Sequence, residues 1–418
     1  MFEEIFLASS RIAAYRKAVG DESIKEIKKI AKPLRGLRVV HVNSTAKAGG
    51  GGVAEILRSL LPLMRDVGLN AKWTIITPPK EFFGVTQKIH DSLQGSRSGL
   101  SNDDKKLYIE TGKKIAESFK KEKADVWIFH DPQPLAIPFF ADRLKSAISR
   151  IHIDLSSPNK DTWNFLLPFF EPYKKIIFSM DEFVNPKIPR EKVKIFAPAI
   201  DPLISKNKAL PRSVAKRVIA SHNIHPDKPL IAQISRFDRW KDPIGVIKAF
   251  YIAKNEIPDL QLVLLGLMLA SDNPRSATVL KQVQRYVRGD PANIHLLYDP
   301  EEIKTENETL VNAFQAGSDV VIQKSIKEGF GLTVTEAMWK GKPVIGGRAG
   351  GIKLQIKDGR NGFLVSSPEE CGQRIVELIK NPALSRRMGR RARESVKKKF
   401  LIPRLLRDYL NLFKEVLE

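Results

Sequence analysis

Cysteine is almost absent from this sequence of 418 residues, with Cys371 as its only representative. A single cysteine excludes an internal disulfide and any metal site built from several cysteines. Long apolar runs are absent too, because the longest, residues 260–270, is far too short to cross a bilayer. No basic stretch precedes an apolar core at the start, so no secretory signal is apparent. We therefore expect a soluble, cytoplasmic protein.

Acidic residues are much fewer than basic residues in this sequence. Lys and Arg number 70 against 47 Asp and Glu, which gives a formal net charge of +23. Such a field favours anionic partners, namely nucleic acid, acidic membrane surfaces or phosphorylated small molecules. The densest basic cluster, residues 386–399, reads as the solvated face of a helix, and no RNA-binding aromatic signature or zinc-finger spacing accompanies it. We expect neither nucleic acid nor membrane as a partner, and nucleic-acid binding stays open as an alternative.

Several common site motifs are missing as well. The glycines at 49–52 do not match Gly-x-Gly-x-x-Gly, and no Walker lysine follows them. A dehydrogenase or a P-loop enzyme is thereby disfavoured. The His and Asp residues do not have the spacing of a metal motif such as His-Glu-x-x-His. We expect no metal site and no essential cofactor.

What the sequence does have is an alternation of strand-like and helix-like segments that occurs twice. Short apolar runs predict strands. These runs are residues 37–42, 71–76, 125–129, 151–153 and 175–179 in the first half, and 229–234, 260–265, 293–297, 320–322, 343–346 and 362–365 in the second. The alternation predicts an α/β fold with two doubly wound, Rossmann-like parallel-sheet domains.

The segments between the strands complete the expected organisation. Residues 1–32 read as a charged, largely helical opening, and 81–99 read as a long loop. Helices are expected at 53–67 and 103–121. Because the pattern pauses near residues 197–202, we expect an N-terminal domain at 1–200 and a C-terminal domain at 201–401, followed by a last helix within 402–418.

The most informative segment is residues 325–345, Ser-Ile-Lys-Glu-Gly-Phe-Gly-Leu-Thr-Val-Thr-Glu-Ala-Met-Trp-Lys-Gly-Lys-Pro-Val-Ile. Glycines let the backbone approach a ligand, and a helix that begins just after them directs unpaired N–H groups at an anion. Glu328 at the mouth of the turn is placed for sugar hydroxyls, and Glu336, about two turns further along a helix, for a ribose diol. The turn itself offers Gly329, Phe330, Gly331, Leu332 and Thr333. Together these residues describe a nucleotide-sugar site.

A second candidate site follows the expected strand 229–234. Ligands of open α/β sheets bind beyond the carboxyl ends of the strands. Arg236 offers a fork for phosphate oxygens and Lys241 a point charge, so the two can neutralise a departing diphosphate. Arg239 adds a further positive charge that suits either a phosphate or a nucleoside diphosphate.

Polar residues also follow the strands of the first half. His152 and Asp154 are placed to bind hydroxyls of a transferred sugar, and His130 and Asp131 to hold an acceptor. A histidine satisfied inside the core is the alternative interpretation for each ring.

Residues 325–345 resemble the C-terminal signature of the retaining glycosyltransferases of family four, which share the two-domain GT-B fold. From about residue 37 onward the chain is similar to the trehalose synthases of the glycosyltransferring type. The similar segments are residues 41–46, 50–55, 130–134, 152–159, 235–243 and 323–334. The resemblance implies two domains that face a cleft, the first binding the acceptor and the second the nucleotide sugar, with residues 402–418 packed back on the first.

The resemblance also implies an activity. Such enzymes join a nucleoside diphosphate glucose, for example ADP-glucose or UDP-glucose, to free glucose and form α,α-1,1-trehalose, reversibly and without a metal. The catalytic residues would be Arg236, Lys241, Glu328 and His152. The family also implies that the first Gly-rich loop contacts the acceptor or the donor phosphate, which adds Asn43, Gly50, Gly51 and Gly52 to the substrate-binding residues. Front-face attack, in which the leaving phosphate takes the acceptor proton, is the implied retaining mechanism.

Other functions remain open at this stage. Trehalose phosphorylase is closely similar and uses phosphate in place of the nucleotide. Another family-four glycosyltransferase is a further alternative, and so is a nucleotide-sugar epimerase, although no acid/base groups for epimerisation stand out. The sequence leaves the nucleotide base, the favoured direction and the oligomeric state undetermined, a homodimer being one option.

Overall fold

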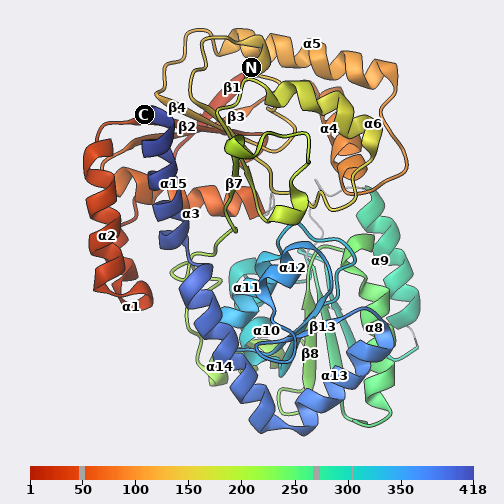
Figure 1. Ribbon diagram of the computed structural model, residues 1–418. Coiled ribbons are helices and arrows are strands. Elements are labelled where there is room, and N and C mark those ends of the chain that lie inside the picture. Colours follow the sequence, from red (N-terminus) through yellow and green to blue (C-terminus); the bar gives the residue numbers. More distant parts are fainter. Residues whose placement is uncertain (47–51, 267–273, 288, 304) are drawn as a thin grey trace. The chain divides into compact units, whose positions relative to one another are not determined.

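The computed structural model describes residues 1–46, 52–266, 274–287, 289–303 and 305–418 (Figure 1). The chain divides into two compact units. Unit 1 consists of Met1–Ala199 with Phe400–Glu418, and unit 2 of Ile200–Lys399. Among the described residues, no helix combines the length and the apolar character that crossing a membrane requires.

Unit 1 is built on a seven-stranded sheet in the order β1-β3-β2-β4-β5-β6-β7. The strands are β1 (Phe2–Ile5), β2 (Arg38–Asn43), β3 (Asn70–Ile76), β4 (Val126–His130), β5 (Ala147–Arg150), β6 (Lys175–Phe178) and β7 (Val193–Ile195). All neighbours run parallel except β1, which pairs antiparallel with β3 at one edge. The central strands β2 and β4 are almost entirely buried, which explains why they read as continuous apolar runs.

Helices cover the two faces of this sheet (Figure 1). One face carries α2 (Asp21–Ala31), α3 (Gly52–Asp66) and α15 (Ile402–Leu417), and the other carries α4 (Lys80–Leu93), α5 (Asn102–Ser118) and α6 (Lys160–Leu166). The last helix, α15, is strongly amphipathic and buries Leu406, Tyr409, Leu410 and Phe413. Burial of that apolar stripe holds the C-terminal segment on unit 1 although some 200 residues of unit 2 precede it.

Three expectations for unit 1 are wrong in detail. Residues 81–99 are not a long loop, because α4 occupies most of them and buries an i, i+3, i+4 pattern of Phe82, Val85, Ile89 and Leu93. The opening is not helical throughout, since β1 begins at Phe2. The strand expected at 151–153 lies earlier, at β5, so the residues that follow Arg150 are loop.

Unit 2 has a six-stranded, wholly parallel sheet in the order β10-β9-β8-β11-β12-β13. The strands are β8 (Leu230–Ile234), β9 (Gln261–Leu265), β10 (Ile294–Leu297), β11 (Val320–Gln323), β12 (Val344–Gly347) and β13 (Phe363–Val365). The two parallel-sheet α/β units confirm the expected fold class. Because β8 and β11 are direct neighbours, the loops that follow them lie at the same edge of the sheet.

The helices of unit 2 also form two layers (Figure 1). One layer contains α8 (Pro243–Lys254), α9 (Pro274–Val287) and α13 (Pro368–Lys380), and the other contains α7 (Arg212–Ala220), α10 (Asn307–Gly317) and α11 (Leu332–Trp339). Helix α14 (Pro382–Lys399) contacts both α11 and α13. The short helix α12 (Gly350–Gln355) follows β12 and packs against the start of α11. Each layer closes its own apolar core against the sheet.

Candidate functional site

Two loops of unit 2 are tied together at the carboxyl edge of the sheet. One follows β8 and spans residues 235–242, and the other follows β11 and spans residues 324–331. The backbone N–H of Ile326 donates to the carbonyl of Trp240 over 2.7 Å. These are the loops in which the sequence placed the phosphate and sugar ligands, and the structure brings them into contact.

An ion pair joins the same loops through their side chains. The Nζ of Lys241 lies 2.5 Å from Oε2 of Glu328, and the hydroxyl of Ser325 donates to the same oxygen over 3.1 Å. The side chains of Lys241 and Glu328 are only 18% and 10% exposed. Charge-assisted hydrogen bonds at low exposure are strong and directional, so this pair fixes the relative position of the two loops.

A second pair lies beside the first and involves a backbone conformation that L-residues rarely adopt. Asp242 has φ +50°, and its carboxylate accepts from the N–H of Gly245 over 3.0 Å and so caps α8. The same side chain is hydrogen-bonded to the ammonium group of Lys324. Left-handed non-glycine residues persist where their surroundings over-determine them, and such positions cluster at functional sites.

The other basic residues of the first loop are arranged differently. Arg236 is exposed, and in the part of the chain that the structure describes its guanidinium has no hydrogen bond or ion pair. Arg239 instead stacks over the ring of Trp240, with 4.3 Å from the guanidinium carbon to the ring centroid. Arg236 is therefore available to an anion, whereas Arg239 has a resident partner.

The Gly-Phe-Gly turn ends at the N-terminus of α11. Gly331 has φ +84° and is the N-cap residue, and no side chain caps this helix end. The first N–H groups of α11 are thus not satisfied by a capping side chain, which suits an anion. Gln355 of α12 donates to the carbonyl of Phe330 over 2.6 Å, and this hydrogen bond holds the turn in place. Gly329, Leu332 and Thr333 are half-buried at its rim.

Glu336 lies inside unit 2, on α11. It is 2% exposed, and its carboxylate oxygens accept from Lys206 Nζ at 2.7 Å and from Gln315 Nε2 at 2.8 Å. Burial opposes its ionisation, but the charges of Lys206 and Lys340 outweigh burial and hold the pKa of Glu336 below its ordinary value. The residue is thus an ionised carboxylate with protein partners on both oxygens.

In unit 1 three histidine rings form a row on the face of the sheet that α15 covers. Nδ1 of His41 lies 3.0 Å from Nε2 of His130, and Nδ1 of His130 lies 2.9 Å from Nε2 of His152. Their ring planes are stacked at 21° and 22°. His41 and His130 are buried, and His152 is half-buried after β5. The structure thus brings together two of the predicted site residues, together with a third ring, His41, for which the sequence predicted no role.

Asp131 and Asp154 lie beside this row. Asp131 has φ +64°, and its Oδ1 accepts the backbone N–H of His152 over 2.7 Å. Burial raises the pKa of Asp131 to about 7, against the smaller lowering effects of that hydrogen bond and of Arg150. Asp154 is buried and its Oδ1 accepts the backbone N–H of Ser156 over 2.9 Å.

The first Gly-rich loop is only partly described. Asn43 is buried, accepts from the indole N–H of Trp73 over 2.8 Å, and donates to the carbonyl of Thr45. Gly52 is the exposed first residue of α3. Gly50 and Gly51 lie outside the described residues, so their expected contact with substrate stays a prediction.

Several residues that organise the site escaped the sequence analysis. Lys206 and Gln315 reach Glu336 from 130 and 21 positions away, and no motif surrounds either of them. No sequence motif marks Gln355, although it lies only 25 positions from Phe330 in the turn that it holds. Lys324 and Asp242 lie within motif segments that the sequence analysis names. Their signal is that each is a charged residue close in sequence to a predicted ligand.

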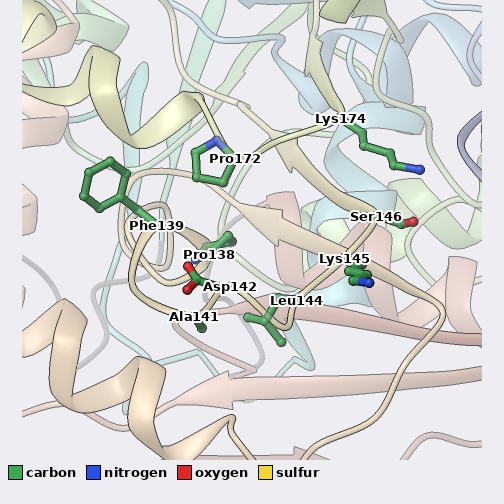
Figure 2. Close-up of a pocket in the computed structure, with 9 residues that line it drawn as sticks. All are labelled: Pro138, Phe139, Ala141, Asp142, Leu144, Lys145, Ser146, Pro172 and Lys174. Carbon is green, nitrogen blue, oxygen red and sulfur yellow. The ribbon is translucent and has the colours of Figure 1, made fainter.

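A surface pocket in unit 1 lies away from all these residues (Figure 2). Its lining consists of Pro138, Phe139, Ala141, Asp142, Leu144, Lys145, Ser146, Pro172 and Lys174. Ser146 directly precedes β5, so the pocket is at the amino end of the strand, whereas His152 follows its carboxyl end. The described residues contain no group of three or more His, Cys, Asp or Glu side chains suited to a metal ion.

Comparison with known proteins places these features in a family. Residues 41–185 match the family described as trehalose synthase, N-terminal domain, and residues 215–395 match glycosyl transferases group 1. A trehalose synthase of Pyrococcus horikoshii is 41% identical over 98% of this chain and 97% of its own length. One from Thermococcus litoralis is 43% identical over 96% of both chains. A trehalose phosphorylase of Pleurotus pulmonarius is 27% identical over 91% of this chain but 58% of its own length.

Solved structures share the fold at low sequence identity. Sucrose-phosphate synthase from Thermosynechococcus elongatus superposes with a TM-score of 0.69 at 17% identity, covering 90% of this chain and 98% of that one. A trehalose-6-phosphate synthase, OtsA, gives a TM-score of 0.71 at 12% identity, covering 90% and 99%. Both are glycosyltransferases of the GT-B type, and the likeness supports the fold.

Proposed function

Because the chain belongs to the trehalose synthase family of glycosyltransferases, we propose that it joins a nucleoside diphosphate glucose to free glucose, with retention, and releases α,α-1,1-trehalose and the nucleoside diphosphate. One observation carries the proposal. The two tied loops of unit 2 combine an exposed guanidinium (Arg236), a paired ammonium and carboxylate (Lys241 and Glu328) and a helix N-terminus without a capping side chain. Positive charge and N–H groups suit a diphosphate, and the carboxylate suits sugar hydroxyls.

The donor chemistry follows from that arrangement. As the bond between the sugar C1 and the phosphate oxygen breaks, negative charge builds on the diphosphate. Arg236, Lys241 and the first N–H groups of α11 then stabilise that charge without having to reorganise, because the Lys241–Glu328 pair and Gln355 already hold the two loops in place.

The sugar and acceptor chemistry belongs to unit 1 in this proposal. His152 is half-buried and held by Asp131 through its backbone, so its ring can contact hydroxyls of the transferred sugar. The anomeric hydroxyl of glucose forms the new bond to C1 on the face that the phosphate leaves, and its proton passes to the leaving phosphate oxygen. This route requires no enzyme nucleophile. It requires no metal or other cofactor either, so activity should survive treatment with EDTA.

The ribose contact assigned to Glu336 is part of the same proposal. A carboxylate has about four lone-pair positions, so Glu336 can accept a ribose hydroxyl in addition to Lys206 and Gln315. At 2% exposure only a small part of the carboxylate is accessible to a ribose hydroxyl, so nucleoside diphosphate binding by a Glu336→Ala variant tests this contact directly.

The test of the proposed function is product identification. The protein is incubated with ADP-, UDP- or GDP-glucose and glucose, and both nucleoside diphosphate and reducing sugar are followed. We expect reducing sugar to fall as the nucleoside diphosphate appears, since the product joins two anomeric carbons, and we expect trehalase to digest the product. Extension of glycogen, or activity only with a phosphorylated acceptor, would indicate another glycosyltransferase. Isomerisation of the donor without acceptor would indicate an epimerase.

Trehalose phosphorylase is the second candidate, because a phosphorylase matches 91% of this chain. The same basic loop would then bind orthophosphate in place of the nucleoside diphosphate. Incubation of trehalose with either phosphate or a nucleoside diphosphate separates the two reactions. Glucose 1-phosphate formed from orthophosphate would favour the phosphorylase, and nucleoside diphosphate glucose would favour the transferase.

A further inference from the structure

The central ring of the three-histidine row, His130, has no free nitrogen. Nε2 of His130 is bonded to His41 and Nδ1 to His152. A ring with both nitrogens engaged, and only 2% exposed, is poorly placed to bind a sugar hydroxyl. His152, by contrast, is half-buried and uses only Nε2 among the described residues, so its Nδ1 is the outer end of the row.

We expect all three rings to be neutral at physiological pH, because burial disfavours the charged form of an imidazole. Burial lowers the pKa of His41 to about 3 and holds that of His130 and of His152 well below the ordinary value. The nearby charge of Arg150 lowers the pKa of His130 and His152 further. A neutral imidazole has one N–H and one lone pair.

Counting protons leaves two arrangements. Because His130 has a single N–H, it donates in one of its two hydrogen bonds and accepts in the other, so both bonds run in the same direction. Either every ring donates from Nδ1 toward His152, which leaves an N–H at Nδ1 of His152, or every ring donates from Nε2 toward His41, which leaves an N–H at Nε2 of His41. In each ring, the hydrogen bond made by one nitrogen determines whether the other nitrogen carries the proton.

The inner end of the row selects between them. Nε2 of His41 is buried and has no hydrogen-bond partner among the residues that the structure describes. The ring of His41 also packs edge-on against the ring of Tyr409 on α15, with 5.7 Å between the ring centroids, and such a contact offers at most a weak N–H···π interaction. Buried N–H groups without an acceptor are rarer in proteins than acceptors without a donor. The arrangement that leaves a lone pair on Nε2 of His41 is therefore favoured.

We propose that His130 is a positioning residue that fixes His152 as its neutral Nδ1–H tautomer, so that His152 presents a hydrogen-bond donor to an oxygen of the transferred sugar. The tautomer assignment rests on the geometry of the row and on the neutral state of its buried rings, whereas the contact with sugar rests on the proposed function. Free neutral histidine prefers the Nε2–H form, so the row imposes the less common tautomer on the ring that meets the substrate.

The first test reads the tautomer in the free protein. The chain has only seven histidines, so long-range ¹H–¹⁵N correlation of histidine-labelled protein can resolve them. We expect Nδ1 of His152 to carry the proton, and His130→Phe to shift His152 toward the Nε2–H form. His41→Phe is the matched control: it removes a ring from the same row but leaves the bond between His130 and His152, so the His152 tautomer should persist. An Nε2–H tautomer of His152 in the unaltered protein would overturn the proposal.

The second test is a double-mutant cycle on transfer. If His130 acts only through His152, His130→Phe should lower kcat/KM roughly tenfold, as expected for the loss of one hydrogen bond in the transition state, and should have almost no further effect in a His152→Ala background. A general structural defect would persist in that background and count against the proposal. Inactivity of the unaltered protein toward nucleoside diphosphate glucose would refute the proposed function but leave the tautomer measurement valid.

Discussion

Lys241 and Glu328 form an ion pair of 2.5 Å although 87 positions separate them in the chain. The pair links the loop after β8 to the loop after β11 and is largely shielded from water. Lys241 consequently has two tasks in the proposed site. It contributes positive charge toward a diphosphate, and it neutralises the largely buried carboxylate of Glu328.

The basic loop gives the first prediction. Arg236→Ala and Lys241→Ala should each reduce kcat roughly a hundredfold or more, because the charge of the leaving group builds up in the transition state. Arg236→Ala should leave stability unchanged, whereas Lys241→Ala should also lower the unfolding free energy, since it removes the ammonium group that pairs with the largely buried Glu328. Arg239→Ala, which removes a residue stacked on Trp240, is the control for loss of charge in this loop. Near-normal turnover in both test variants would remove Arg236 and Lys241 from the mechanism.

The two glutamates of residues 325–345, Glu328 and Glu336, should have different effects when they are replaced. Glu328→Ala should impair handling of the sugar and lower kcat, whereas Glu336→Ala should chiefly weaken binding of the nucleoside diphosphate, because ribose contacts are the same in the ground and transition states. Calorimetric titration of the nucleoside diphosphate distinguishes the two. An equal loss of affinity in both variants would contradict this division.

Glu336 should also matter for stability. Its removal takes away the carboxylate that lies 2.7 Å from Lys206 Nζ, in a site where the Lys206 side chain is 15% exposed. Breaking a buried pair by removing one member typically costs about 3–5 kcal/mol, so Glu336→Ala should show that order of loss in urea unfolding. The double variant Lys206→Met/Glu336→Ala should recover part of it. No recovery would mean that the pair itself is not the source of the loss.

Gly351 tests how tightly the Gly-Phe-Gly turn is held. A Cβ at this position would lie 2.5 Å from Cα of Phe330 and 2.9 Å from the carbonyl oxygen of Gly329. Gly351→Ala must therefore displace the turn, and we expect it to raise KM for the donor and to destabilise unit 2 by about 1–3 kcal/mol. Gly84→Ala is the matched control, because Gly84 is an exposed helical residue with nothing near its Cβ position. That change should stabilise the protein by about 0.5–1 kcal/mol.

Asp131 predicts a pH dependence. Burial raises the pKa of its carboxyl to about 7 in the folded protein, above the value of an unfolded aspartate, about 3.9. Its favourable contribution to stability is therefore complete below about pH 4 and is lost as pH rises toward 7. Asp131→Asn keeps an oxygen for the N–H of His152 and tolerates the left-handed backbone, but it cannot ionise. Urea unfolding should show the variant gaining on the unaltered protein between pH 4 and pH 8, on the order of 1 kcal/mol because the residue is only half-buried. A constant difference across that range would refute the shifted pKa.

Much of the fold could be predicted from local sequence. Apolar runs such as residues 37–42 and 229–234 form strands of the two sheets, because a central parallel strand is buried on both faces and must be apolar along its length. The prediction failed where the local signal was mixed. Polar and glycine residues interrupt the apolar pattern of residues 81–99, so the buried face of α4 was not recognised. Strand β1 forms by pairing with the edge of β3, which its own sequence does not indicate.

The segments that carry chemistry could also be predicted from the sequence, since glycines, carboxylates and basic residues follow strand-like runs in both halves. The partners of these residues depend on the tertiary structure. The Lys241–Glu328 pair joins residues 87 positions apart, and the contact of Lys206 with Glu336 joins residues 130 positions apart. The row from His41 to His152 joins residues on or just after neighbouring strands of one sheet. Strand order sets these contacts, and strand order is settled by packing of the whole sheet and its helices, which no short segment of the chain encodes.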